Sequence, residues 1–180
     1  MPRTRKTFPS IVAALDAAER SLVLDELLAV HPELAEEGDE IARALLSSVT
    51  VEEVAEDLRS EIELLDITDL ASRAGRQPGR GYVHETEAAY ELVEEVFRPF
   101  VADMQRRAQL GLSEAARAVA LGTITGLYHC RRAQDGTVLA YSGEDTVFGL
   151  AEEVRTEAGR AGIDLPVALL DDLCPEWDVR

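Results

Sequence analysis

Apolar side chains recur at three- or four-residue intervals through most of this chain, and this spacing restricts the fold more than any other feature. The clearest stripe follows Thr50 and consists of Val51, Val54, Leu58, Ile62 and Leu65. A one-sided stripe with helical period indicates an amphipathic helix that packs one face on a core. Residues 89–104 and 147–158 show the same period.

Composition and helix-start signals also favour helices. Ala, Leu, Glu and Arg are strong helix formers and dominate the sequence, whereas aromatic residues make up only 5% of it. Asp16–Glu19 and Thr50–Glu53 have the spacing of a capping box, in which two residues three apart close a helix start. We therefore predict an all-α fold of about eight or nine helices, as an irregular multi-helix bundle or as stacked helical hairpins of the α-solenoid type.

The predicted helices follow one another through short links. We predict a basic N-terminal tail over residues 1–8 and a single all-helical domain over 9–180, with a seam at 75–85, where glycines and a proline interrupt the helical pattern. The T-V-L-A-Y segment at 137–141 is expected to be a short extended piece.

Pro99, Gly122 and Gly126 are poor helix formers that lie inside predicted helices. Pro99 lacks a backbone donor and its ring clashes with the preceding turn, so we expect a kink or a break there. Gly122 and Gly126 lie four residues apart, and each glycine costs a helix about 1 kcal/mol. We therefore expect another helix to pack closely on this flat face, either from the same chain or from a second subunit in a homo-oligomer.

The charge balance bears on the partners. The 35 acidic residues outnumber the 18 basic ones and give a net charge of −17. Nucleic-acid binding usually needs a basic surface, so this balance argues against a nucleic-acid partner. No apolar run reaches the roughly 18–20 residues that span a bilayer, and no apolar signal core follows the basic N-terminus. We expect a cytoplasmic protein with no membrane partner.

Cysteine and histidine spacing does not indicate a metal centre. Cys130 and Cys174 are far apart, no C-x-x-C pair exists, and we expect two buried free thiols. None of His31, His84 and His129 has the E-x-x-H or H-E-x-x-H spacing of metal ligands. We expect no metal and no cofactor.

The least helical stretch is G-R-Q-P-G-R-G-Y-V-H, from Gly75 to His84. A phosphate-binding loop would need a strand before it and a lysine or hydroxyl at its end. The preceding segment is predicted to be helical and lysine is absent, so an interhelical loop is the expected structure.

This loop nevertheless carries a local basic patch on an acidic chain. The patch could bind an acidic partner or pair with a neighbouring acidic face of the same chain. Functional residues often lie on loops held by a rigid scaffold. The predicted partner-binding residues are Arg73, Arg76, Arg80, Tyr82 and His84.

The sequence leaves three kinds of function open. The first is a non-catalytic helical interaction module that binds a protein partner through an interhelical groove. The second is a helical transcriptional regulator that binds DNA or a small ligand, since Leu112–Arg132 has some features of a helix-turn-helix. The third is an enzyme with an unrecognised site, although no G-x-S-x-G nucleophile motif is present.

Several phrases add a family resemblance. They are L-L-A-V-H-P-E-L, V-E-E-V-A-E-D-L, L-L-D-I-T-D-L-A-S-R-A-G-R, T-E-A-A-Y-E-L-V-E-E, G-L-Y-H-C and C-P-E-W. Together they resemble the helical segments that accompany bacterial SWIM zinc-finger proteins. The cysteines and histidine of that finger are missing here, so its zinc site is not implied. The resemblance implies a bacterial helical-repeat-like module and assigns no functional residue.

Overall fold

The structure is a computed structural model that describes residues 11–132, 136–143, 145–175 and 177. The predicted basic tail at 1–8 lies outside these residues. The chain divides into two compact units, Met1–Ala44 and Leu45–Arg180. Each unit is described by itself.

The described part of the first unit is helical. Its elements are α1 (Ile11–Ala14), α2 (Ala17–Val30), the 3-10 turn η1 (Pro32–Leu34) and α3 (Ala35–Ser47), whose last residues belong to the second unit. The capping box predicted at Asp16 is confirmed, because the Asp16 carboxylate accepts the Glu19 N–H and the Glu19 carboxylate accepts the Asp16 N–H. No residue of these four elements is buried.

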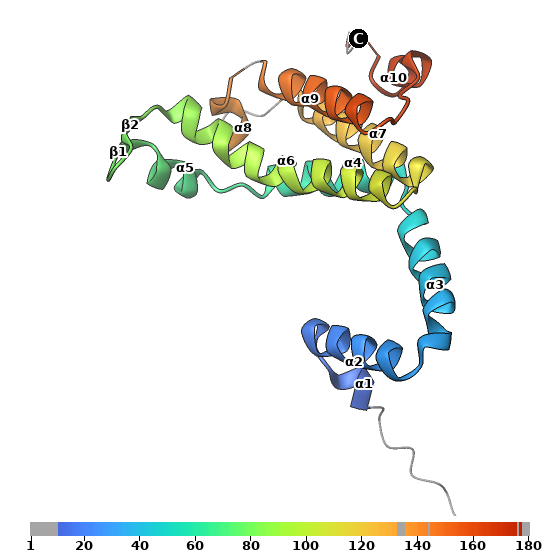
Figure 1. Ribbon diagram of the computed structural model, residues 1–180. Helices are drawn as coiled ribbons and strands as arrows, with labels where there is room; N and C mark the ends of the chain where they lie inside the picture. The colour runs from blue at the N-terminus through green and yellow to red at the C-terminus, as the bar shows by residue number, and fades with distance from the viewer. Residues whose placement is uncertain (1–10, 133–135, 144, 176, 178–180) are drawn as a thin grey trace, which may run out of the picture. The chain divides into compact units, whose positions relative to one another are not determined.

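The second unit contains the core. Its elements are α4 (Val51–Glu63), α5 (Ile67–Arg73), β1 (Gly75–Gln77), β2 (Gly81–Val83), α6 (Glu85–Gln109), α7 (Ser113–Cys130), α8 (Val138–Tyr141), α9 (Thr146–Arg160) and α10 (Val167–Leu173). The helices α4, α6 and α9 pack around α7 (Figure 1). The predicted all-α class is confirmed, with ten α-helices among the described residues.

The close contact between α4 and α7 explains the two interior glycines of α7. A Cβ atom placed on Gly122 would lie 2.6 Å from the Cβ of Val54, and one placed on Gly126 would lie 2.8 Å from the carbonyl oxygen of Ala55. The predicted close helix is therefore present, and it is α4 of the same chain. This glycine face is not available to a second subunit.

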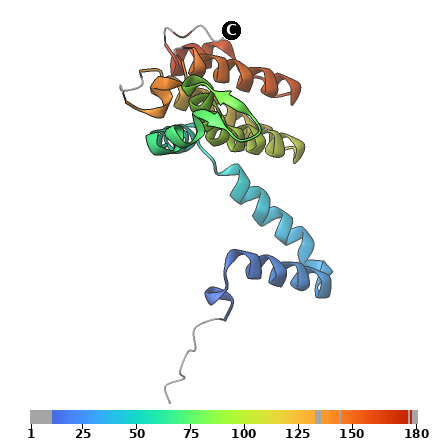
Figure 2. The same cartoon turned by 90° about the vertical axis from the view of Figure 1, so that its left-hand side faces the viewer.

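The segment 75–85 differs from the prediction. It is a two-stranded antiparallel hairpin rather than an irregular loop. Leu70 lies just before the hairpin and Val83 lies within it, and both are buried in the same core as α6 and α7. This shared core holds the segment in an ordered structure. Figure 2 shows the two green strands from the front.

Two other local predictions need correction. Residues 138–141 form the short helix α8 instead of an extended piece, because one helical turn buries both Val138 and Leu139. The helix α6 continues through Pro99 without a break. Pro99 is exposed, so its ring and the carbonyl that it leaves unpaired face water, where a helix tolerates them.

The C-terminal segment packs on the core of the second unit. The short helix α10 ends at Leu173, and Trp177 returns to the core. Its ring centroid lies 5.5 Å from that of Tyr128 and 5.8 Å from that of Phe148. This aromatic cluster holds Trp177 against α7 and α9.

Candidate functional site

The hairpin between α5 and α6 is built around a tight turn. Gln77, Pro78, Gly79 and Arg80 form the turn, and the Arg80 N–H donates to the Gln77 carbonyl at 3.3 Å. Gly79 has a φ of +80°, the value that a type II turn requires after a proline. Gln77 then pairs with Gly81 across the strands. The Q-P-G-R sequence therefore determines the hairpin.

A glutamine side chain attaches this hairpin to the preceding helix. The Gln77 Nε2 donates to the carbonyl of Ser72 at 2.9 Å and to that of Arg73 at 2.8 Å. These carbonyls belong to the last turn of α5, where backbone acceptors lack helical partners. The hairpin thus caps the end of α5.

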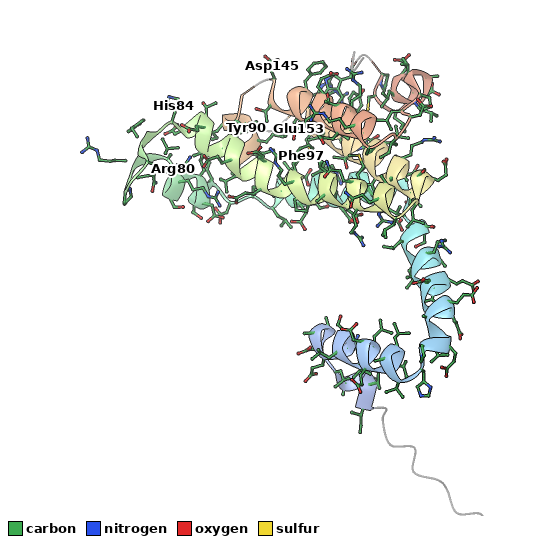
Figure 3. All side chains as sticks on the ribbon, viewed as in Figure 1. Arg80, His84, Tyr90, Phe97, Asp145 and Glu153 are labelled. Carbon is green, nitrogen blue, oxygen red and sulfur yellow. The ribbon has the colours of Figure 1, made fainter. Side chains whose placement is uncertain are left out.

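Two of the predicted arginines hold the hairpin region against α6. Arg73 donates to both carboxylate oxygens of Glu95, at 2.6 and 2.8 Å, and Arg80 forms an ion pair with Glu91. These bonds lower the pKa values of Glu95 and Glu91. Figure 3 shows Arg80 and His84 at the hairpin end of α6. Arg73 and Arg80 pair with an acidic face of the same chain, which is one of the two roles predicted for the patch.

The third arginine has a different position. Arg76 and Tyr82 are directly opposite each other in the two strands, so their side chains lie on the same face of the hairpin. Tyr82 is 75% exposed, and Arg76 is exposed and forms no ion pair with any described residue. Val83, on the opposite face, is buried. The outer face therefore presents a free cation beside an aromatic ring.

His84 has a structural contact. It is the N-cap of α6, and its Nδ1 accepts the N–H of Thr86 at 3.4 Å. Of the five predicted partner-binding residues, Arg73, Arg80 and His84 thus stabilise the local structure. Arg76 and Tyr82 remain available to a partner.

A groove of about 400 Å³ lies beside the exposed face of the hairpin. Its described lining consists of Ile67, Leu70, Ala71, Ala74, Gly75, Tyr82, Glu85 and Tyr141. Most of the aliphatic residues come from α5, whose C-cap is Ala74, while Tyr82 comes from β2 and Tyr141 from α8. The groove therefore combines aliphatic side chains with two tyrosines from distant segments and with the acidic Glu85.

Of the residues that line this groove, only Tyr82 was predicted from the sequence, and the missed residues include Ile67 and Tyr141. Both are exposed apolar or aromatic residues in short helices, and no local pattern connects them to Tyr82. A correct assignment of residues 138–141 as helix would have placed Tyr141 at the end of an element, but not beside the hairpin.

A second depression, of about 440 Å³, lies near Cys130. Its described lining includes Glu63, His129 and Arg132. Burial and the nearby carboxylate of Glu63 raise the pKa of the Cys130 thiol to about 11, so the thiol is protonated at neutral pH and is a poor nucleophile. Cys174 is also buried, and both cysteines are free, as predicted.

The helix-turn-helix interpretation of Leu112–Arg132 does not fit the structure. The segment contains one continuous helix, α7, and thirteen of its 18 residues are buried. A recognition helix must expose a face to a DNA groove. Because most of α7 is buried, it cannot present such a face to DNA.

None of the described helices combines the length and hydropathy that crossing a bilayer requires. No three His, Cys, Asp or Glu side chains within the described ranges are grouped so that they could hold a metal ion. Comparisons with protein-family models, curated proteins and solved structures gave no match.

Proposed function

We propose that this protein is a non-catalytic docking module that binds an extended segment of a partner protein in the groove beside the hairpin. The observation that carries the proposal is the pairing of Arg76 and Tyr82 on the exposed hairpin face, where Tyr82 also lines the groove. Both residues are among those expected from the sequence to contact a partner.

The chemistry of the groove indicates the kind of segment that fits. Aliphatic residues of α5 can bury a large apolar side chain, and Tyr82 and Tyr141 supply rigid aromatic area. The guanidinium of Arg76 can form a charge-assisted hydrogen bond with a carboxylate. We therefore infer that the preferred segment has a large apolar residue close to an acidic one.

Peptide selection tests this proposal. A library of random peptides is selected on the full chain, with the Tyr82→Ala protein used to remove peptides that bind elsewhere. We expect enrichment of peptides that combine Asp or Glu with Leu, Ile or Phe. A representative peptide should bind at least about tenfold more weakly to Tyr82→Ala and to Arg76→Ala, a loss typical of an interface residue worth more than 1 kcal/mol.

Matched substitutions provide the controls. Tyr90 is a partly exposed tyrosine of α6 that does not line the groove, and Arg43 is an exposed arginine of α3. Tyr90→Ala and Arg43→Ala should bind the peptide as the natural protein does. The proposal is wrong if no peptide is enriched after the counter-selection, or if all four variants bind equally.

A further inference from the structure

The first unit exposes a large aliphatic surface. We call its described residues, 11–44, the N-terminal arm. Eight large aliphatic side chains of the arm are between 42% and 82% exposed: Ile11, Val12, Leu22, Val23, Leu24, Leu27, Val30 and Ile41. Soluble monomers rarely expose so many in one short segment, so this surface indicates an interaction site.

The helix α2 shows why the arm needs a neighbour on more than one side. Leu22, Val23 and Leu24 are consecutive, and successive residues of a helix point about 100° apart. The leucines and valines of α2 therefore occur on several sides of the helix, between its charged residues, and burying them requires more than one neighbouring element. In the arm, by contrast, no residue of α2 is buried.

The arm is also too small to be stable without further contacts. Segments below about 40 residues rarely fold without disulfides, metals or oligomerisation, because they bury too little surface. The sequence of the arm contains no cysteine. Oligomerisation is therefore the stabilising device that its apolar surface fits.

The composition of the surface favours a permanent partner of the same kind. Residues 11–44 contain no Phe, Tyr or Trp, whereas the central contacts of transient interfaces are rich in Tyr, Trp and Arg. Permanent homodimer interfaces resemble a domain core cut in half, and a standard interface uses about 20–30 residues of each partner. The arm has both the aliphatic chemistry and the size for such an interface.

We propose that the arm pairs with the arm of a second copy of this chain. The helices α2 and α3 of each copy would then form a four-helix arrangement, which gives every α2 neighbours on two sides. A two-fold axis would let the same aliphatic surface serve both copies. This proposal does not depend on the function proposed for the groove.

The charge of the arm makes a specific prediction about salt. Residues 11–44 contain nine acidic and two basic side chains, a net charge of −7 with histidine neutral. On α3, Glu36 and Glu40 lie on the side opposite Gly38 and Ile41, outside the aliphatic stripe. Glu37, one turn before Ile41, lies on the same side of the helix as that residue. Like charges would therefore lie at and beside the paired surfaces, and salt should strengthen pairing by screening them. A cationic partner helix would instead bind more weakly in salt.

Sedimentation equilibrium of the full chain tests the proposal. We expect twice the chain mass of 19.7 kDa at micromolar concentration. The dimer Kd should fall at least about tenfold between roughly 0.05 and 0.5 M NaCl. The double variant Leu27→Glu/Ile41→Glu should be monomeric, with the thermal unfolding of the second unit unchanged when Trp177 fluorescence is followed.

A matched variant separates the arm from other surfaces. Leu64 is 77% exposed and belongs to the second unit, so Leu64→Glu should remain dimeric. A mass of 19.7 kDa at about 100 µM, near the weak limit of a useful dimer, would overturn the proposal. So would a dimer that survives Leu27→Glu/Ile41→Glu, or one that salt weakens.

Discussion

The contact between α4 and α7 allows a direct test of the packing of the second unit. We consider Gly126→Ala, which adds one methyl group. In an open helix this change stabilises by about 1 kcal/mol, because alanine is the better helix former. Here the added Cβ would lie 2.8 Å from the carbonyl oxygen of Ala55 and 3.2 Å from the Cβ of Leu58. Carbon atoms attract best at about 3.5–4.0 Å, so α4 has to move away.

Overpacking of this kind costs about 1–3 kcal/mol, and movement of a whole helix lies in the upper part of that range. After subtraction of the gain in helix propensity, Gly126→Ala should destabilise the second unit by about 1–2 kcal/mol. Gly122→Ala should do the same, because its added Cβ would meet Val54 at 2.6 Å. The double variant need not be additive, since both glycines contact α4.

Two glycines of α9 are the matched controls. Nothing lies within 4 Å of a Cβ placed on Gly149 or Gly159. Each alanine substitution there should therefore stabilise by up to about 1 kcal/mol. Urea unfolding followed by the fluorescence of Trp177, which packs against Tyr128 of α7, measures all four variants. Equal stabilisation by Gly126→Ala and Gly149→Ala would refute the close α4–α7 packing.

Three further predictions concern the second unit. Because Arg73 holds the pKa of Glu95 below its ordinary 4.5, their pair stabilises the fold above about pH 4.5, and this contribution is lost as pH falls through the lowered pKa. Glu95→Gln should therefore reduce the loss of stability at acid pH in urea titrations; an unchanged profile would contradict the pair. Cys130 and Cys174 have pKa values near 11 and are buried, so a thiol reagent should label them slowly until guanidinium unfolds the chain; fast labelling of the folded protein would contradict their burial. Tyr128→Phe removes a 2.9 Å hydrogen bond to the C-terminal segment and should cost about 1 kcal/mol in urea unfolding, whereas no loss would show that the bond is dispensable.

The sequence was sufficient for the helices because their signals are local. The capping boxes that begin at Asp16 and Thr50 form as predicted, and the stripe through Leu58 and Ile62 is buried. The paired glycines of α7 also indicated a close neighbour correctly. Each of these signals depends on residues within a few positions of one another, where helix geometry fixes which side chains share a face.

The hairpin and the groove depend on other information. The turn at Pro78 and Gly79 has a recognisable type II signature, but its three-residue strands are too short to show alternation. Arg73 and Arg80 form ion pairs with glutamates of α6, whereas Arg76 forms none with the described residues. Such pairings are set by tertiary packing, so sequence alone could not distinguish the available Arg76 from its bonded neighbours.

The contacts that hold the hairpin in place should affect how quickly a ligand binds beside it. Gln77 forms hydrogen bonds that hold β1 against the end of α5. Arg73 and Arg80 form bonds that hold the hairpin and the end of α5 against α6. The hairpin is therefore already ordered before a ligand binds. Binding would cost little conformational entropy of the hairpin. Competing ligands should therefore arrive at similar rates and differ mainly in how long they stay.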